Sequence, residues 1–242
     1  MKRTTYIPHQ SDTLSLVIPL YNNALTLQKQ LDLCIRVLKS NSRSFEILIC
    51  DDGSVDVSPS ILKRYASRYP FIRIITHGVN QGIPKTIFHL YKEARNDYIL
   101  LFSLDGDWDP EDIGKLIVAM GGTNADIVVG KRNKSVYSFY RKIVSYGYNV
   151  VTRMLFGIDT IDAGSIKLFS RSLFSGKKII SRSMFFEAEM IIRAIRNGAH
   201  MVALPVHFYK KPTDRGRGAL ARSVLESFFD AFRLFFVLKI LS

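Results

Sequence analysis

The strongest constraint on the fold is an alternation between short, continuously apolar runs and longer stretches with helical periodicity. The apolar runs are "LSLVIPL" at 14–20, "FEILICD" at 45–51, "FIRIIT" at 71–76, "DYILLFSLD" at 97–105 and "ADIVVG" at 125–130. Amphipathic stretches lie between them, at about 24–39, 56–68, 83–95 and 109–120. Continuous hydrophobicity predicts strands buried on both faces, as in a parallel sheet wrapped by helices. We therefore expect a doubly wound α/β fold.

The pattern changes after about residue 130, but no long Gly/Ser/Pro linker interrupts the chain. We expect helices at about 137–156 and 184–197, strands at "GSIKLFS" and "HMVALPVHF", and a final helix from about 220. These elements predict a single domain over residues 1–219, followed by an amphipathic helix over 220–242.

The hydrophobic content is that of a folded protein, and the net charge limits the kinds of partner that the chain attracts. Hydrophobic residues make up 47% of the 242 residues, and the formal net charge is +13, which attracts nucleic acid, anionic lipid or phosphorylated metabolites. The basic residues are dispersed and no recognised nucleic-acid motif occurs, so we expect no nucleic-acid partner. Cys34 and Cys50 lie outside any metal-spaced group, and we interpret both as buried apolar residues in a reducing compartment.

Carboxylates gather where apolar runs end. The stretch "LLFSLDGDWDPEDI" carries five of them within eight residues, and the loops "PLYNN" and "DDGSVD" also follow predicted strands. In open α/β sheets ligands bind beyond the carboxyl ends of the strands, so we expect these loops to form one crevice. Repulsion there raises carboxyl pKa values unless a cation or hydrogen-bond donors compensate. Mg²⁺ or Mn²⁺ is the simplest compensation, with Asp105 and Asp107 as ligands.

Some of these acids also have a structural interpretation. Asp109 can cap a helix that has Pro110 at its first position, with Glu111 and Asp112 at the positive helix end. Asp105 and Asp107 precede that cap, so we assign them to function. The "DDGS" segment could be a plain turn, although two acids directly after a buried strand favour ligand binding.

These motifs, in this order, resemble the family 2 glycosyltransferases with a GT-A fold, which transfer sugars from nucleotide-sugar donors. The resemblance implies a nucleotide-sugar half at about 14–130 and an acceptor half at 131–219. It implies that Pro19, Tyr21, Asp51 and Asp52 line the base and ribose pocket, and that Asp105 and Asp107 hold the metal on the diphosphate. Asn23 stands where many relatives carry Glu, and Tyr21 could instead be a surface aromatic residue.

The second half is similar to the dolichyl- and polyprenyl-phosphate sugar transferases, through "VVGKRN", "YRKIVS" and "IDAGSIKLFSR". In that branch the metal motif reads Asp-x-Asp-x-Gln. Here Asp109 stands in place of the Gln, which keeps an oxygen ligand and adds a negative charge. Arg141 and Ser145 share one helix face, and with Arg132 they could bind the acceptor phosphate. The alternative is a solvated basic face.

The chain departs from this branch near its end. In "YKKPTDRGRGALARS", Arg215 and Arg217 could form a basic loop that closes on the diphosphate, but other subgroups of the family have such loops too.

The acceptor decides whether a base is needed. A hydroxyl acceptor requires one, whereas a lipid phosphate is already ionised. Candidate bases are Asp162, Glu187 and Glu189. Glu189 lies where the family commonly places a carboxylate facing the acceptor, with a helix-surface Glu as the alternative, and Glu187 is expected to serve the helix dipole.

The C-terminal stretch combines aromatic and charged residues. Its apolar face is expected to contain Val224, Leu225, Phe228, Phe232, Phe235 and Phe236. The stretch is too charged to span a bilayer and suits an interfacial helix, with packing on the protein core or on a partner as the alternative. The polar N-terminus and the short apolar run after it predict no signal peptide. We expect a cytoplasmic protein, peripheral on the inner face of the cell membrane.

The expected function is metal-dependent, inverting transfer of a sugar from a UDP- or GDP-type donor to polyprenyl or dolichyl phosphate. Asp107 would act in catalysis through the Mg²⁺ or Mn²⁺ ion, and Glu189 as a base. One alternative is transfer to a saccharide or lipid-linked glycan hydroxyl in cell-surface polysaccharide synthesis. Another is a non-catalytic polyanion- or membrane-binding protein on a degenerate transferase fold.

Overall fold

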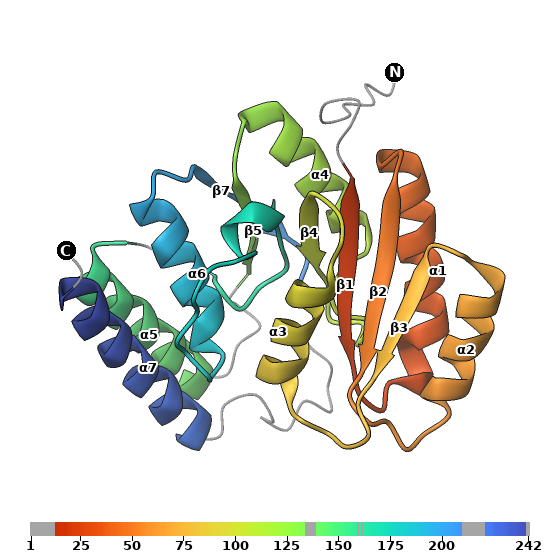
Figure 1. Ribbon diagram of the computed structural model, residues 1–242, viewed down its shortest axis with the longest axis horizontal. Coiled ribbons are helices and arrows are strands. Elements are labelled where there is room, and N and C mark those ends of the chain that lie inside the picture. Colours follow the sequence, from red (N-terminus) through yellow and green to blue (C-terminus); the bar gives the residue numbers. More distant parts are fainter. Residues whose placement is uncertain (1–12, 134–138, 159, 161, 210–220, 241–242) are drawn as a thin grey trace.

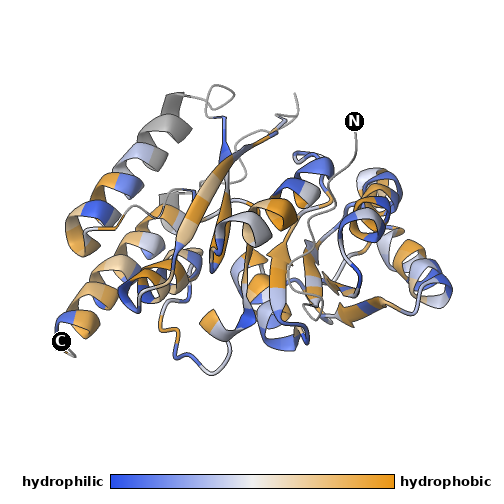
Figure 2. Cartoon of the chain, turned by 90° about the horizontal axis from the view of Figure 1, so that it is seen from above, coloured by the Kyte–Doolittle hydropathy of each residue, from blue (hydrophilic) through white to orange (hydrophobic). Residues whose placement is uncertain are grey.

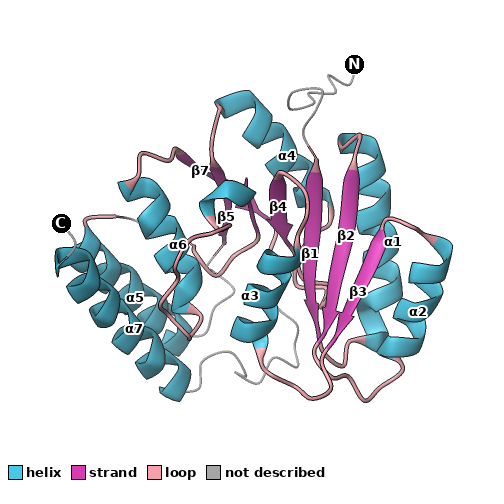
Figure 3. Ribbon diagram, viewed as in Figure 1, coloured by secondary structure: helices cyan, strands magenta, loops and turns pink. Residues whose placement is uncertain are grey.

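The computed structural model describes residues 13–133, 139–158, 160, 162–209 and 221–240, and the side chains of 139–145 and 221–222 are not described. The strands are β1 (Leu14–Leu20), β2 (Phe45–Asp51), β3 (Ile72–Thr76), β4 (Tyr98–Leu101), β5 (Ile127–Arg132), β6 (Lys167–Ser170) and β7 (Met201–Val206). The helices are α1 (Ala24–Asn41), α2 (Ser58–Arg68), α3 (Ile83–Glu93), α4 (Glu111–Thr123), α5 (Phe139–Phe156), α6 (Phe185–Arg196) and α7 (Ala221–Ile240), with the short 3-10 helix η2 (Arg171–Leu173) after β6 (Figure 3).

All seven strands form one sheet in the order β3-β2-β1-β4-β6-β5-β7 (Figure 1). The pairs β2–β3, β1–β2, β1–β4 and β5–β7 are parallel. Only β6 runs against its neighbours, pairing antiparallel with both β4 and β5. The predicted mainly parallel α/β fold is therefore confirmed. The sheet includes strands from both predicted halves of the chain.

Helices cover both faces of the sheet, which explains the continuous hydrophobicity of its strands. Alternate residues point to opposite faces, so Leu16 and Ile18 join one core with α1, α2 and α4, while Val17 joins the other with α3 and α6. Side chains of α5 and α7 extend this second core. In Figure 2 the strands carry long hydrophobic stretches, whereas the helices mix hydrophobic and hydrophilic residues.

Element boundaries differ most where the chain turns toward the carboxyl edge. The apolar run at 97–105 is a strand only over Tyr98–Leu101, because "FSLD" curves away from the sheet and leads into the acidic loop. The strand expected at 164–170 begins only at Lys167. The Lys167 ammonium is fully buried and lies 2.7 Å from the Glu187 carboxylate of α6, which also accepts a hydrogen bond from Tyr91 of α3 at 2.6 Å.

The loops after β1, β2 and β4 are hydrogen-bonded to one another. Asn22 N donates to Ser54 Oγ at 2.8 Å, and Val55 N donates to the Asn22 side-chain oxygen at 2.9 Å. Thr26 Oγ1, in the first turn of α1, donates to the Leu104 carbonyl at 2.7 Å. The parallel strands β1, β2 and β3 end at the same edge, toward which their arrowheads point in Figure 1. This bonding holds the three polar loops as one unit.

Gly53 allows another loop to approach this unit closely. Its φ is +76°, and a Cβ built on it would lie 2.9 Å from the Asn80 nitrogen and 2.9 Å from the Val79 carbonyl carbon. Both contacts are to backbone, so a side chain at position 53 would push away the loop between β3 and α3. Positive φ alone disfavours residues with a Cβ.

We expect Gly53→Ala to lower the free energy of unfolding by at least ~1–2 kcal/mol, the cost of a left-handed conformation for a residue with a Cβ. The measurement is equilibrium denaturation by urea. Gly122→Ala in α4 is the matched control, since nothing lies within 4 Å of its added Cβ. That change should leave stability unchanged or raise it by up to ~1 kcal/mol. Equal stabilities for Gly53→Ala and the unsubstituted protein would contradict the close approach.

Candidate functional site

A pocket of about 370 Å³ opens at the carboxyl edge, beyond β1 and beside the N-terminus of α3. The predicted site residues that line it are Pro19, Tyr21, Asn23, Asp52 and Asp105. Most of the remaining lining consists of residues that were not predicted from the sequence, namely Asn80, Gly82, Ile83, Thr86 and Ser103. The loop "NQG" before α3 was the available signal, because helix N-termini at this edge bind anions. The structure thus brings the three polar loops to one pocket.

Asp52 is buried and holds the loop that precedes α3. Its carboxylate accepts hydrogen bonds from Gln81 N and Gly82 N, both at 2.9 Å, and its Oδ1 lies 2.7 Å from His77 Nδ1. Burial raises the pKa of this carboxyl, but these donors and Thr86 together hold it below its usual value. The protein's own donors therefore stabilise the Asp52 charge.

Asp51 is not among the residues that line this pocket, and its predicted role in nucleotide-sugar binding remains a prediction. Asp51 is the last residue of β2, and neighbouring strand residues point to opposite faces. Its carboxylate accepts a hydrogen bond from Ser54 N at 3.0 Å, and its other neighbours include Leu62 of α2 and Thr76 of β3 in a separate cavity. Asp51 thus shapes the turn after β2, whereas Asp52 faces α3.

Asp105 and Asp107 lie on a tight turn through Gly106, whose φ is +83°. The Asp105 carboxylate accepts a hydrogen bond from Asp107 N at 3.0 Å, and the Asp107 carbonyl accepts one from Tyr209 N at 2.7 Å. The second bond ties the acidic loop to the segment after β7. Among the described basic residues, none forms an ion pair with Asp105. This pocket-facing carboxylate can therefore bind a cation.

Asp109 is directed to the start of α4. Its Oδ1 accepts a hydrogen bond from Glu111 N at 3.0 Å, and its Oδ2 lies 3.3 Å from the Tyr209 hydroxyl. The Asp109 charge raises the pKa of Tyr209. The oxygens of Asp105, Asp107 and Asp109 do not form a three-ligand group in the described part of the chain. The geometry favours the capping interpretation for Asp109 over the predicted metal ligation.

Arg132, at the end of β5, is held beside the acidic loop. Its guanidinium forms a bidentate ion pair with Asp162, with Nε donating to Oδ2 at 2.7 Å and the second bond running from a terminal nitrogen to Oδ1. Its Cζ lies 5.7 Å from the Trp108 ring centroid and 5.5 Å from that of Phe208. Because Trp108 follows Asp107 directly, Arg132 is fixed at the side of the metal motif. Asp162 positions this arginine, which leaves it poorly suited to act as a base.

The two glutamates of α6 have structural partners, and the role of Glu189 as a base remains a prediction. The Glu189 side chain is fully buried and accepts bonds from Ser181 N at 2.8 Å, Ser181 Oγ at 2.6 Å and Arg193 Nε at 2.8 Å. It holds the loop before α6 and does not line the pocket. Glu187 lies in the first turn of α6, as expected, but its main partner is the buried Lys167.

Four predicted binding residues cannot be placed. Arg141 and Ser145 lie in α5, among the residues whose side chains are not described, and Arg215 and Arg217 lie outside the described residues altogether. Their roles remain predictions.

Helix α7 has two apolar faces. Ala231 and Leu234 are buried against the core, and Asp230 accepts hydrogen bonds from Ser183 N and Oγ at 2.9 and 2.7 Å. The exposed apolar face carries Leu225, Phe229, Phe232, Phe236 and Ile240. The predicted face is thus only partly right, since Val224, Phe228 and Phe235 are half-buried. None of the helices in the described ranges is both long and apolar enough to cross a bilayer.

A family model, "Glycosyl transferase family 2", matches residues 15–179. A dolichyl-phosphate beta-glucosyltransferase of Trichomonas vaginalis is 30% identical over 213 residues, covering 81% of this chain and 65% of the relative. A dodecaprenyl-phosphate galacturonate synthase of Rhizobium johnstonii is 28% identical over 189 residues, covering 76% of this chain and 55% of the relative. The chain thus spans between about half and two thirds of the length of these relatives.

Solved structures show the same fold at low identity. Glucosyl-3-phosphoglycerate synthase of Mycobacterium tuberculosis, in complex with Mn²⁺, UDP and phosphoglyceric acid, has a TM-score of 0.69 at 16% identity, covering 91% of this chain and 78% of that one. A mannosyltransferase of Pyrobaculum calidifontis, in complex with GDP-Man and Mn²⁺, has a TM-score of 0.64 at 17% identity, covering 94% and 66%. These likenesses confirm the GT-A fold. Since the family model also matches more than half of its length, this chain belongs to glycosyl transferase family 2.

Proposed function

We propose that this protein transfers a sugar from a UDP- or GDP-type nucleotide sugar to a polyprenyl or dolichyl phosphate, with inversion. The observation that carries the proposal is the pocket at the carboxyl edge, where Tyr21, Asp52 and Asp105 converge from three loops. It offers an aromatic side chain for a base, the N-terminus of α3 for phosphates, and a carboxylate for a cation. Solved relatives with this fold are described in complex with UDP or GDP-Man and Mn²⁺.

Mg²⁺ or Mn²⁺ fits the residues that are present. Asp105 and Asp107 supply hard oxygen ligands, and no described basic residue forms an ion pair with Asp105. When bound, such an ion stabilises the negative charge that develops on a departing diphosphate. Asp105 and Asp107 would hold the ion, while Gly106 allows their turn and Tyr209 N fixes it. Catalysis by Asp107 is thus proposed to be indirect.

The surroundings of the three candidate bases favour a phosphate acceptor over a hydroxyl acceptor. Each of the three candidate bases has a structural partner: Asp162 binds Arg132, Glu187 binds Lys167, and Glu189 holds Ser181. A phosphate acceptor needs no base, because it is ionised at neutral pH, and it needs positive charge for positioning. Arg132 supplies that charge, and Arg141 and Ser145 are proposed to add to it. Two curated relatives are named for dolichyl-phosphate and dodecaprenyl-phosphate chemistry.

Contact with a membrane surface follows from the exposed apolar face of α7. Phe229 is 75% exposed and Phe236 is 60% exposed, and both lie on one stripe with Leu225, Phe232 and Ile240. The exposed residues Arg233 and Lys239 can contact anionic headgroups beside this stripe. We therefore propose a peripheral enzyme on the cytoplasmic face of the membrane, where a lipid-linked phosphate is accessible.

Asn substitutions in the acidic loop test the metal. We expect Asp105→Asn and Asp107→Asn each to lower metal-dependent turnover on the order of 10²-fold, because charge stabilisation on the diphosphate is lost. Sugar transfer is measured at several Mn²⁺ and Mg²⁺ concentrations. Asp109→Asn is the control, since Asn also caps helices well and activity should be retained. Full activity in the first two variants would refute the proposed cation site.

A radiolabelled nucleotide-sugar assay with polyprenyl phosphate and with glycan acceptors tests the acceptor. We expect an acid-labile lipid product, and an Arg132→Lys variant with a higher KM for the lipid, since lysine cannot keep the bidentate pair with Asp162. Glycan transfer without a lipid product would instead establish the hydroxyl-acceptor alternative. Metal-independent nucleotide-sugar binding without any turnover would favour a non-catalytic protein.

Vesicle sedimentation tests the membrane contact. The double variant Phe229→Ser/Phe236→Ser should bind vesicles of anionic phospholipid about tenfold or more weakly, because two interfacial aromatic side chains are lost. Val118→Ser is a matched control, because Val118 is an exposed apolar residue of α4, on the opposite face of the sheet. Unchanged vesicle binding by the double variant would instead indicate that the stripe contacts protein.

A further inference from the structure

A second cavity, of about 710 Å³, lies on the other side of α3 from the pocket at the carboxyl edge. Ile83 and Thr86 of α3 line the pocket, whereas Lys85, Phe88 and Lys92 of the same helix line the cavity. Residues three and four apart share a helix face, so the two sets lie on different faces of α3. The rest of the cavity lining comes mainly from the segment before α6 and from α7.

This second cavity, the basic cavity, is lined by five basic side chains and, among the residues that the structure describes, by no carboxylate. The basic residues are Lys85 and Lys92 of α3, Lys178 and Arg182 of the segment before α6, and Arg233 of α7. None of them forms an ion pair with a described acidic residue. By contrast, Glu187 and Glu189 of the neighbouring α6 both bind basic partners. Five like charges without a counter-charge repel one another, so the basic cavity favours an external anion.

The basic cavity also has an apolar part. Phe88 of α3 and Phe186 of α6 both line it, and their rings meet edge to face with the centroids 5.8 Å apart. Ile179 and Ile180 add aliphatic surface from the segment before α6. The Lys92 Nζ atom lies 5.0 Å from the centroid of the Phe88 ring, so positive charge and apolar surface are adjacent. A ligand that combines an anionic group with apolar atoms matches this lining better than a simple anion does.

Arg233 places the basic cavity beside the exposed apolar face of α7. Phe229 lies four residues before Arg233 and Phe236 three residues after it, so the three side chains share one helix face. The Arg233 guanidinium also donates a hydrogen bond to the Ile180 carbonyl at 3.4 Å, which joins α7 to the segment before α6. The cavity is therefore adjacent to the surface that is proposed to contact the membrane.

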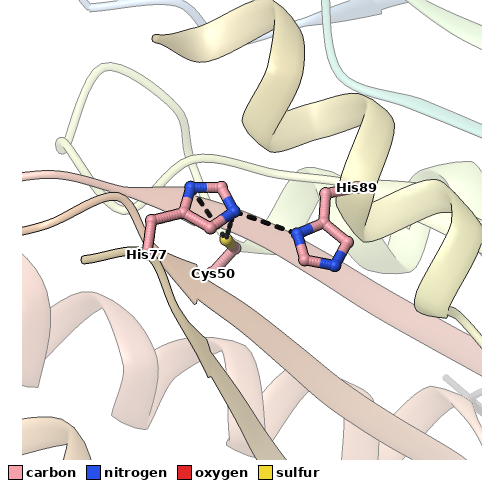
Figure 4. Close-up of side chains that lie close together, drawn as sticks. All are labelled: Cys50, His77 and His89. Carbon is pink, nitrogen blue, oxygen red and sulfur yellow. Dashed lines mark hydrogen bonds between the residues drawn. The ribbon is translucent and has the colours of Figure 1, made fainter. Parts of the chain in front are cut away.

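Two histidines connect the basic cavity to the pocket. His77 and His89 both line the cavity, and His77 Nε2 lies 2.9 Å from His89 Nδ1, with an angle of 4° between the ring planes (Figure 4). Asp52 Oδ1 lies 2.7 Å from His77 Nδ1, so in the neutral imidazole Nδ1 donates to the carboxylate and Nε2 accepts from His89. The Cys50 sulfur lies against the same ring, 3.5 Å from Nε2. One wall of the cavity is thus tied to Asp52, which holds the loop at the border of the pocket.

We propose that the basic cavity binds the phosphate of an anionic phospholipid headgroup, with the apolar atoms next to that phosphate against Phe88 and Phe186. The inference rests on the proposed membrane contact of α7 and deepens it, because it names the class of lipid that this surface selects. The site is separate from the proposed acceptor site, since neither the acidic loop nor Arg132 lines the cavity. The headgroup would hold the protein on an anionic membrane and would take no part in sugar transfer.

Titration with short-chain lipids tests this site without any assay of sugar transfer. The full chain is titrated by calorimetry with dihexanoyl phosphatidylglycerol, below the concentration at which this lipid forms micelles, and separately with dihexanoyl phosphatidylcholine and with inorganic phosphate. At about 0.15 M salt, the general attraction of a chain with a net charge of +13 to anions is largely screened. We expect saturable binding of phosphatidylglycerol, about tenfold or more tighter than that of phosphatidylcholine, which carries a cation, or of phosphate, which lacks apolar atoms.

Two double variants with the same change in charge locate the binding. Lys85→Gln/Lys178→Gln should weaken phosphatidylglycerol binding about tenfold or more, because two of the five cations of the basic cavity are lost. Lys29→Gln/Arg64→Gln is the matched control, since it removes the same charge from exposed residues of α1 and α2, on the opposite face of the sheet. Asp105→Asn should bind the lipid as the unsubstituted protein does, so failure of the proposed transferase function and failure of the lipid site are distinguishable.

Imidazole NMR signals show whether the lipid occupies the basic cavity. Phosphatidylglycerol should shift the ring signals of His77 and His89, which line the cavity, and should leave those of His207, beside Asp112 of α4, unchanged. A lipid that binds without shifting the first two signals lies elsewhere and refutes the site. So does the absence of saturable lipid binding, or an equal affinity in the two double variants. Inorganic phosphate bound as tightly as the lipid would overturn the lipid assignment in favour of a soluble phosphorylated ligand.

Discussion

The Asp52 carboxylate is the interaction on which the arrangement of the pocket depends. It joins the end of β2 to His77 after β3 and to the backbone at the start of α3, and these are three separate segments of the sequence. Each of its bonds involves a charged acceptor, and such bonds contribute ~1.5–3 kcal/mol when buried. Without this carboxylate, the backbone N–H groups of Gln81 and Gly82 would lose their partner and the loop that borders the pocket would lose its anchor. A single side chain thus couples the sheet to the N-terminus of α3, which borders the pocket.

The adjacent carboxylates of Asp51 and Asp52 avoid mutual repulsion because consecutive residues at the end of a strand point to opposite faces of the sheet. Asp51 ends β2 and faces the α2 side, where Ser54 N binds it, while Asp52 faces α3. Each carboxylate therefore has its own donors, and the sheet lies between them. For Asp52 the donors outweigh burial, so its pKa is lowered, although crowding alone would raise it. The sequence prediction allowed for donors or a cation, and here the donors suffice.

The pattern of hydrophobic residues predicted the fold well, because a strand that is buried on both faces is continuously apolar in the sequence. The sequence also indicated which loops meet, since parallel strands end at one edge, and Pro19, Tyr21, Asn23, Asp52 and Asp105 do line one pocket. What it could not indicate is the direction of individual side chains. Glu189 lies on a helix in the expected position, but its carboxylate turns to Ser181 and Arg193, which are contacts that only the packed structure determines.

The contacts among Cys50, His77 and His89 were missed for a related reason. A group of polar residues is recognisable from its spacing when its members lie close together in the sequence, whereas these three come from β2, the residue after β3, and α3. The usable signal was that Cys50 and Asp52 share a face and that two histidines follow at the same edge. The two faces of α7 are a similar case, since one sequence pattern served both a buried side at Leu234 and an exposed side at Phe229.

The distribution of compensated charge supports the proposed position of the ligand site. In the second half of the chain, the buried acids have basic partners within the protein: Lys167 lies against Glu187, and Arg132 lies against Asp162. Removing one partner of such a buried pair costs ~3–5 kcal/mol, so these acids are bound to structural roles. Asp105 instead faces the pocket and has a backbone N–H as its partner, and no described basic residue pairs with it. The charge that could hold the proposed cation is therefore at the carboxyl edge of the sheet, beside the N-terminus of α3, where the proposed diphosphate would complete its coordination.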